Sequence, residues 1–188
     1  LQDRHLARVR CDPMSQSAPT PSARPAPRRL ALPDRYYERA LDHFARERLN
    51  LALADLDEAI ALNPRKAEYY AARGLVLLLS EWRADAEADF AQALRLDPAQ
   101  WLAYYGRGML AFQGGDFTAA IDQFSRAQQL APQRPEIYVY RAVAFYRAGN
   151  AGEAMADLQV ALPLFAPRDS RREVAQRWLE LCQRVAGA

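Results

Sequence analysis

Three prolines recur at an interval of 34 residues, and each closes a nearly identical phrase. The phrases are Ala-Ile-Ala-Leu-Asn-Pro, Ala-Leu-Arg-Leu-Asp-Pro and Ala-Gln-Gln-Leu-Ala-Pro, which end at Pro64, Pro98 and Pro132. A fixed period of about 20–50 residues indicates a repeat architecture, in which each unit completes the burial of its apolar face by stacking on its neighbours. This period constrains the fold more than any other feature of the chain.

The same interval recovers small and large residues in one register four times, although in the fourth copy the closing proline has shifted to Pro167. Small residues recur at Ala40, Gly74, Gly108 and Ala142, tyrosines at Tyr36, Tyr70, Tyr104 and Tyr138, and large residues at Leu56, Phe90, Phe124 and Leu158. Alanines flank each large residue, as at Ala120 and Ala127 around Phe124. Spacings of four and three place these residues on one face of a helix.

Each copy therefore predicts two helices joined by a short turn. We expect first helices near 34–47, 67–80, 101–114 and 135–148, and second helices near 50–62, 84–96, 117–130 and 151–164. A proline ends each hairpin because it pushes the preceding residue out of the α region. Glycines mark the turns of repeats three and four. Repeat two has Ser80-Glu81-Trp82-Arg83 instead, with Arg83 at the position of Leu49 and Phe117 in the neighbouring repeats. Trp82 either fills the gap that the missing apolar residue leaves or stands exposed as a contact.

The pattern resembles the tetratricopeptide repeat, in which aromatic and small residues alternate on a first helix and Ala, Phe or Tyr, Ala and Pro follow on a second. The resemblance covers residues 34–167, about 70% of the chain. It implies an all-α fold, a right-handed superhelix (α-solenoid) of four TPR-like helix-turn-helix hairpins plus a C-terminal capping helix. The implied repeats are TPR 1 at 34–66, TPR 2 at 67–100, TPR 3 at 101–134 and TPR 4 at 135–167.

The segments on either side of the repeats differ in character. Residues 1–33 contain six of the twelve prolines, six arginines and no aromatic residue, which predicts a disordered Pro/Arg/Ser-rich tail. Residues 168–188 form the expected capping helix, with a capping box from Ser170 to Glu173. Its apolar stripe is expected to contain Val174, Trp178, Leu181 and Val185, with Trp178 closing the last repeat and Cys182 buried beside it.

Arginine also recurs at the 34-residue interval, and an aspartate follows 16 residues later in three repeats. The predicted pairs are Arg39 with Asp55, Arg73 with Asp89, and Arg141 with Asp157. In repeat three, Arg107 precedes Gln123, which leaves Asp122 as a poorer substitute. An arginine largely buried between helices requires a partner. We therefore favour structural ion pairs over an arginine ladder for anionic ligands.

The first helices carry an apolar stripe that points away from their partner helices. In the tetratricopeptide fold such positions line the concave face, so we expect the repeat-to-repeat core to leave them free. Three residues at the edge of this stripe, Gln113, Tyr140 and Arg147, are expected to fix the register of a ligand by hydrogen bonds. Together with them, the predicted partner-binding groove contains Tyr37, Leu41, Phe44, Leu75, Leu78, Tyr105, Met109, Phe112, Gln113, Val139, Tyr140, Val143, Tyr146 and Arg147. It suits an extended peptide or the apolar face of a helix. The alternative is a narrow groove filled by the C-terminal helix or the tail.

These features predict a non-catalytic protein-protein interaction module, an adaptor or assembly scaffold. Some tetratricopeptide proteins hold chaperone C-termini with a carboxylate clamp, but this chain has Tyr37, Leu41, Ala72, Leu102 and Gly106 at the matching positions, which implies no clamp. The alternative function is a self-assembling structural protein that associates through the end of repeat one or the groove. A nucleic-acid-binding repeat is less favoured, because residues 34–188 carry 19 basic and 21 acidic groups, a net charge of −2.

Catalytic, metal and membrane signals are weak. His43 occupies the inward position held by Leu77, Ala111 and Phe145 in the other repeats, so we expect a packed core histidine. We expect no enzyme activity, no cofactor and no metal site, because no nucleophile has a histidine placed to activate it and ligand residues do not cluster. The longest apolar run, Gly74 to Leu79, is far shorter than the roughly 20 residues of a membrane span. Without a visible signal peptide, the expected location is cytoplasmic.

Overall fold

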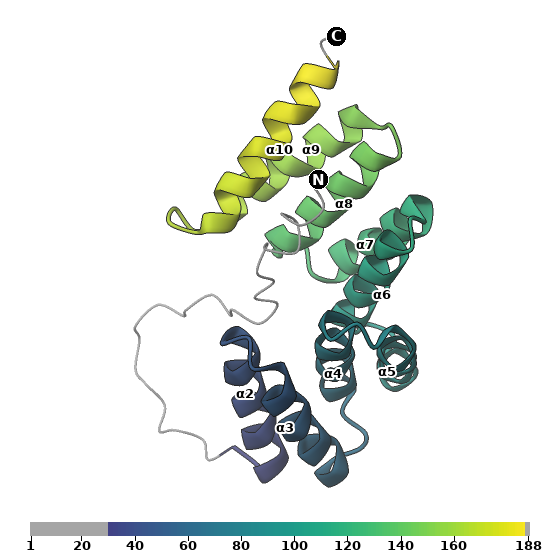
Figure 1. Ribbon diagram of the computed structural model, residues 1–188, viewed down its shortest axis with the longest axis vertical. Helices are drawn as coiled ribbons and strands as arrows, with labels where there is room; N and C mark the ends of the chain where they lie inside the picture. Colours follow the sequence, from purple (N-terminus) through teal and green to yellow (C-terminus); the bar gives the residue numbers. More distant parts are fainter. Residues whose placement is uncertain (1–29, 187–188) are drawn as a thin grey trace. The chain divides into compact units, whose positions relative to one another are not determined.

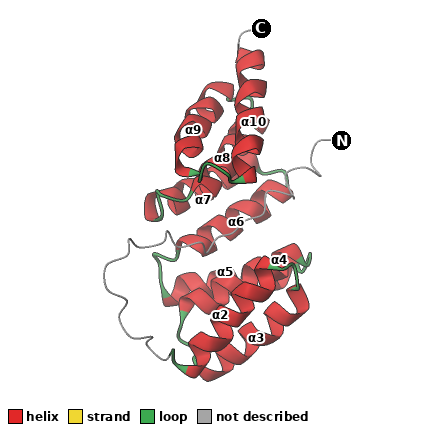
Figure 2. Cartoon of the chain, turned by 90° about the vertical axis from the view of Figure 1, so that its left-hand side faces the viewer, coloured by secondary structure: helices red, strands yellow, loops and turns green. Residues whose placement is uncertain are grey.

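The computed structural model describes residues 30–186, and within them all regular secondary structure is helical (Figures 1 and 2). The helices are α2 (Leu32–Ala45), α3 (Leu49–Leu62), α4 (Ala67–Leu79), α5 (Arg83–Leu96), α6 (Trp101–Gln113), α7 (Phe117–Leu130), α8 (Pro135–Arg147), α9 (Ala151–Leu164) and α10 (Ser170–Ala186). All eight predicted repeat helices are present, and no bound differs from expectation by more than two residues. The prediction for residues 1–29 lies outside the described residues.

Consecutive helices pack as hairpins: α2 on α3, α4 on α5, α6 on α7 and α8 on α9, with α10 on α9. A small residue stands at each crossing because the helices approach closely there. A Cβ atom built on Gly108 would lie 2.6 Å from the ring of Phe124, and one built on Gly74 would lie 2.7 Å from the ring of Phe90. The two outer hairpins use alanine at this position, where the facing residue is the smaller leucine.

The chain divides into two compact units between Pro98 and Ala99. The N-terminal unit contains α2 to α5, and a cluster in its core joins α2, α3 and α4 through Ala40, Ala52, Leu56, Ala72 and Val76. The C-terminal unit contains α6 to α10. A cluster in its core joins α8, α9 and α10 through Tyr138, Val139, Ala142, Ala154, Leu158, Ala161, Phe165, Ala175, Leu179 and Cys182.

The outer side of α2 is charged where the corresponding side of α4 is buried. Tyr69, Ala72 and Val76 of α4 are 0%, 3% and 2% exposed. The residues 34 positions earlier are Arg35, Glu38 and Asp42, and all three are exposed. A solenoid requires a polar outer face on its terminal repeat, and α2 provides this face.

Two expectations at the ends of the repeats are wrong. Leu32 and Pro33, assigned to the tail, form the first turn of α2, where a proline is well tolerated. Ser170 lies inside α10, so Asp169 is the cap: its Oδ1 accepts a hydrogen bond of 2.9 Å from the amide of Arg171. Hydrogen bonds from Arg171 hold the pKa of Asp169 below its ordinary value.

The buried stripe of α10 is also rotated relative to the prediction. Ala175, Leu179 and Cys182 are buried, whereas Val185 is 50% exposed. Trp178 is partly buried and makes an edge contact with the ring of Tyr146 at 5.6 Å. The burial of Cys182 agrees with expectation, and it raises the pKa of this thiol.

The turns between the two helices of all four hairpins share one backbone conformation. The residue with positive φ is Glu47 (58°), Glu81 (66°), Gly115 (82°) and Gly149 (87°), again at intervals of 34. In each turn the next amide donates to the carbonyl five residues earlier, as Trp82 does to Leu77 at 2.9 Å. Glycine adopts this conformation without steric cost, whereas other residues are strained there. Repeats one and two therefore form the same turn without its preferred residue.

We expect Glu81→Gly to raise the free energy of unfolding by up to about 1 kcal/mol, because relief of the strained backbone exceeds the entropy that glycine adds to the unfolded chain. Gly115→Ala should lower it by about 1 kcal/mol, since a Cβ there meets nothing within 4 Å and only the backbone is strained. Urea unfolding followed by circular dichroism measures both. Shifts of the same sign in the two variants would contradict this account.

Candidate functional site

In three repeats an arginine lies between an aspartate and a tyrosine. Each arginine donates through Nε to an aspartate Oδ2 at 2.7 Å and makes a second bond through Nη2 to the other oxygen. The pairs are the three expected ones: Arg39 with Asp55, Arg73 with Asp89, and Arg141 with Asp157. The guanidinium also lies 5.1, 5.7 and 5.8 Å from the ring of a tyrosine three residues earlier.

The buried member of each pair is the aspartate. Asp55, Asp89 and Asp157 are 6%, 6% and 7% exposed. The arginine side chains are 58%, 24% and 14% exposed in the same order. The premise that the arginines are largely buried is therefore wrong for Arg39. The carboxylate needs the cation, because an unpaired buried charge is strongly destabilising.

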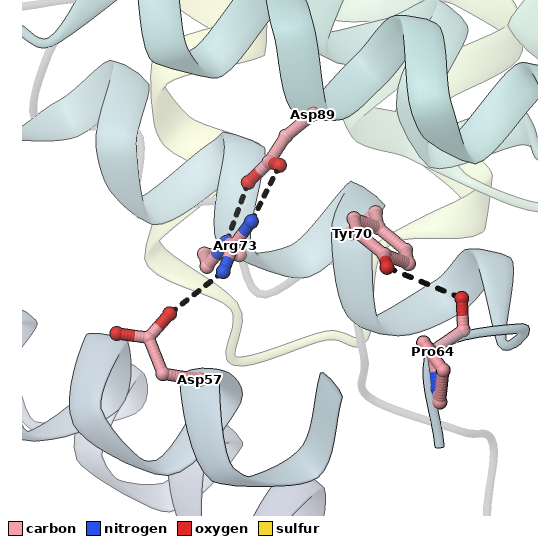
Figure 3. A network of polar contacts seen from close by, with 5 residues as sticks. All are labelled: Asp57, Pro64, Tyr70, Arg73 and Asp89. Carbon is pink, nitrogen blue, oxygen red and sulfur yellow. Dashed lines mark hydrogen bonds and ion pairs between the residues drawn. The ribbon is translucent and has the colours of Figure 1, made fainter. Parts of the chain in front are cut away.

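Arg73 joins three helices of the N-terminal unit. Besides its two bonds to Asp89 of α5, it donates through Nη1 to Asp57 Oδ1 of α3 at 2.7 Å (Figure 3). The hydrogen bonds to Asp89 and Asp57 raise the pKa of Arg73 above its ordinary value. In the C-terminal unit the corresponding donor, Arg141 Nη1, bonds to Ser125 Oγ at 3.0 Å. Each of these two guanidinium groups is therefore held both by its own repeat and by the second helix of the preceding repeat.

The recurring tyrosines bind the closing prolines. Tyr70 OH donates to the carbonyl of Pro64 at 3.1 Å (Figure 3), and Tyr138 OH donates to the carbonyl of Pro132 at 3.0 Å. Each bond joins a first helix to the loop that precedes it. Repeat three departs from the ion-pair pattern: Asp122 is exposed, and Gln123 Oε1 is buried without a hydrogen bond from the described residues.

A second polar cluster joins the start of α2 to the start of α4. Asp34 Oδ1 accepts from Lys66 Nζ at 2.7 Å and from the hydroxyl of Tyr69 at 2.5 Å. The hydrogen bonds from Lys66 and Tyr69 lower the pKa of Asp34, and the bond to Asp34 raises the pKa of Lys66. Burial, followed by the bond to Asp34, raises the pKa of Tyr69 far above its ordinary value.

The raised pKa of Tyr69 predicts a loss of stability in alkaline solution. A tyrosine whose pKa is higher in the folded than in the unfolded state contributes its full stabilisation of the fold below the unfolded pKa, which is about 10. This contribution disappears as the pH rises through the folded-state pKa. Between about pH 10 and 11.5, Tyr69→Phe should therefore flatten the decline in unfolding free energy by up to about 1.4 kcal/mol per pH unit. Tyr104→Phe, outside the cluster, is the control. Equal slopes in wild type and Tyr69→Phe would refute this assignment.

His43 lies beside the first arginine-aspartate pair. Its Nε2 is 3.6 Å from Asp55 Oδ2, and its side chain is 18% exposed. Its Nδ1 is buried without a hydrogen bond from the described residues. The histidine is thus packed at the hairpin interface, at the edge of a carboxylate already held by Arg39.

The apolar stripe of the N-terminal unit is partly open. Tyr37, Leu41 and Phe44, spaced four and three residues apart on α2, are partly buried, while Leu75 and Leu78 of α4 are each 2% exposed. A small apolar pocket lies between α2, α3 and α4. Its walls are Ala40, Leu41, Phe44, Leu56, Ala72, Leu75 and Val76.

The corresponding stripe of the C-terminal unit is mostly closed. Tyr105 and Tyr140 contact each other edge-on at 5.7 Å, and their rings lie 5.8 and 6.0 Å from that of Phe124. Together with the neighbouring Met109, Val139 and Val143 they are at most 6% exposed. Phe112 and Tyr146 are partly buried, and Gln113 and Arg147 are exposed.

The prediction that the partner-binding groove stays outside the core is therefore wrong for seven of its fourteen residues, which are Leu75, Leu78, Tyr105, Met109, Val139, Tyr140 and Val143. The two units differ at one position next to the stripe. Tyr140 faces Tyr105 in the C-terminal unit, whereas Ala72 stands 35 residues after Tyr37 in the N-terminal unit. Alanine leaves unfilled the space that a tyrosine ring occupies, so the pocket forms beside Ala72.

Residues 30–186 contain neither a cluster of metal ligands nor a helix that could span a membrane. No group of three or more His, Cys, Asp or Glu residues there is placed to hold a metal ion. Within the same range, no helix combines the length and apolar character needed to cross a membrane.

Each unit is built from stacked helix hairpins, as α-solenoids are. Residues 83–135 match the family model of the tetratricopeptide repeat, and the hairpins on either side of this match share its 34-residue register. Repeats of this kind generally form non-catalytic surfaces for binding other proteins. Among curated proteins, no sequence matches the chain significantly.

Solved structures of tetratricopeptide proteins share the fold. A crystal structure of MamA is similar with a TM-score of 0.58 and 20% identity, over 71% of this chain and 78% of that chain. The Arabidopsis OM64 TPR domain gives 0.54 and 26%, over 60% and 93% of the two chains. The first TPR of Spaghetti (RPAP3), bound to the HSP90 peptide SRMEEVD, gives 0.59 and 19%, over 65% and 94%.

Proposed function

We propose that this chain is a non-catalytic adaptor or scaffold, and that its N-terminal unit binds a peptide or helix of a partner protein along α2 and α4. The observation that carries the proposal is the apolar pocket beside Ala72, which Leu41, Phe44 and Leu75 help to line. Leu41 and Phe44 are only partly buried, so apolar surface stays accessible at the mouth of the pocket, and such surface can serve as an interaction site. The pocket itself is small and suits the end of one aliphatic side chain from a partner.

The spacing of the partly buried side chains on α2 favours a helical or extended apolar segment as the ligand. Tyr37, Leu41 and Phe44 form a continuous line on one face of α2. A partner helix with apolar residues at the same spacings would lie along this line and place one anchor in the pocket. In the C-terminal unit, Phe112, Gln113, Tyr146 and Arg147 remain accessible at the ends of α6 and α8 and would offer a separate surface.

The chemistry of the ligand should differ from that of the RPAP3 peptide. SRMEEVD is acidic, and the clamp positions Tyr37, Leu41, Ala72, Leu102 and Gly106 supply no cation to hold a carboxylate. We therefore expect SRMEEVD not to bind this chain in a calorimetric titration. Apolar contacts, rather than captured carboxylates, would supply the affinity.

A peptide selected by display against the full chain provides the probe for this surface. We expect Leu41→Ala with Phe44→Ala to weaken its binding by about 2 kcal/mol or more, because buried apolar anchors dominate binding energy. Leu51→Ala with Leu62→Ala is the matched control, since these leucines are 49% and 48% exposed on α3, outside the stripe. Fluorescence polarisation measures all three affinities. Equal affinities would remove α2 as the binding surface.

Two rival functions receive less support. Self-association through the outer side of α2 is disfavoured by the exposed charges of Arg35, Glu38 and Asp42. Nucleic-acid binding is disfavoured by the balance of 19 basic and 21 acidic groups in residues 34–188, because a basic surface supplies most of the affinity for phosphate backbones.

A further inference from the structure

We propose that the turn between α4 and α5 is a self-complementary contact through which two copies of this chain associate about a two-fold axis. The turn places Leu79 and Trp82 on the surface with 43% and 59% of their area exposed. This settles the question left open for Trp82: it stands exposed rather than filling the gap beside Arg83. The contact is separate from the stripe on α2 and does not depend on the proposed peptide binding.

Comparison with repeat three shows that the folded chain does not need a tryptophan here. The two turns have the same backbone, with positive φ at Glu81 and at Gly115. Asp116 occupies the position of Trp82 and caps α7 by accepting a hydrogen bond from the amide of Ala119 at 2.9 Å. Trp82 makes no such side-chain bond to α5. Among the second helices of the four hairpins only α7 has such a cap, so the feature particular to repeat two is a large apolar side chain that is 59% exposed.

An exposed tryptophan beside an exposed leucine has the composition of an interface anchor, because tryptophan is enriched among residues that dominate binding energy. The flanking charges indicate what covers it. Glu81 and Arg83 are both exposed, and neither side chain forms a hydrogen bond or ion pair within the described residues. Glu81, Trp82 and Arg83 together carry no net charge, which disfavours an anionic membrane or a nucleic acid as the partner that covers Trp82.

A second copy satisfies both charges at once. In a two-fold interface, residue i of one copy meets residue j of the other, and j meets i. With Trp82 near the axis, Glu81 of each copy lies beside Arg83 of the other, so two equivalent ion pairs surround the stacked indoles and leucines. The patch is smaller than a standard interface, so we expect a weak dimer, with a dissociation constant on the order of 100 μM.

Sedimentation equilibrium of the full chain between about 10 μM and 1 mM tests the proposal. The average mass should rise from 21.2 kDa toward twice that value as the concentration increases. Trp82→Asp should remain monomeric over the whole range. Because this substitution restores the cap seen at Asp116, its urea midpoint should equal or exceed that of wild type, so loss of association would not reflect unfolding.

Charge exchange tests the two-fold symmetry. Glu81→Arg alone and Arg83→Glu alone should each weaken association at least tenfold, because each places like charges together, and the double exchange should restore it. Leu51→Asp, at a leucine 49% exposed on α3, should leave association unchanged. The proposal is overturned if wild type stays monomeric at 1 mM, if Trp82→Asp associates as wild type does, or if the double exchange fails to restore association.

Discussion

Replacing Arg141 by methionine is expected to destabilise the chain by about 3–5 kcal/mol. Arg141 holds Asp157 through two hydrogen bonds of 2.7 Å, and Asp157 is 7% exposed. Without the guanidinium, the carboxylate stays between α8 and α9 as a buried charge, or it takes up a proton at a cost in free energy. Removing one partner of a buried pair costs more than the pair contributes.

The double variant Arg141→Met with Asp157→Leu separates the buried charge from lost packing. Replacing both members of an ion pair by apolar residues of similar size is often neutral, so the double variant should recover most of the lost stability. Arg39→Met should cause a smaller loss than Arg141→Met, because Arg39 is 58% exposed and His43 Nε2 lies 3.6 Å from Asp55. Urea midpoints measure all three. A loss below about 1 kcal/mol for Arg141→Met would mean that Asp157 is hydrated.

The repeat interval predicts most of the fold because it is set by contacts within one hairpin. Three features act over short stretches of chain: the small residues at helix crossings, the aspartates that follow arginines by 16 residues, and the prolines at hairpin ends. The structure contains the hairpins and the arginine-aspartate pairs that these features predict. The cap of α10 was misplaced because two residues that favour caps are adjacent. Asp169 and Ser170 both suit an N-cap, and the Ser-x-x-Glu pattern selects the second, whereas the backbone selects the first.

The exposed part of the stripe was less predictable because it depends on residues in the next repeat. Tyr37 and Tyr105 have the same place in their repeats, yet Tyr37 is partly exposed and Tyr105 is 0% exposed. The register identifies both as inward-facing, but it does not specify what fills the space opposite. Comparing Ala72 with Tyr140 gives the missing signal, since the large residue closes the C-terminal stripe and the small one leaves a pocket.

Gly108→Ala is expected to destabilise the chain by about 1–2 kcal/mol, although alanine favours helices over glycine by about 1 kcal/mol. The added Cβ would lie 2.6 Å from Phe124 Cδ1 and Cε1. Phe124 is 0% exposed, and Tyr105 and Tyr140 hold its ring, so it has no free space to move into. Overpacking should therefore outweigh the gain in helix propensity.

The outer hairpins show how the same crossing accepts an alanine. Ala142 faces Leu158 in repeat four, and Ala40 faces Leu56 in repeat one. Phe124→Leu alone should also destabilise, because it leaves a cavity and loses two ring contacts. In the double variant the leucine makes room for the Cβ, so the combined loss should fall short of the sum by about 1 kcal/mol or more. If the losses in unfolding free energy of Gly108→Ala and Phe124→Leu add to that of the double variant within about 0.5 kcal/mol, the ring of Phe124 is not the reason for a glycine at position 108.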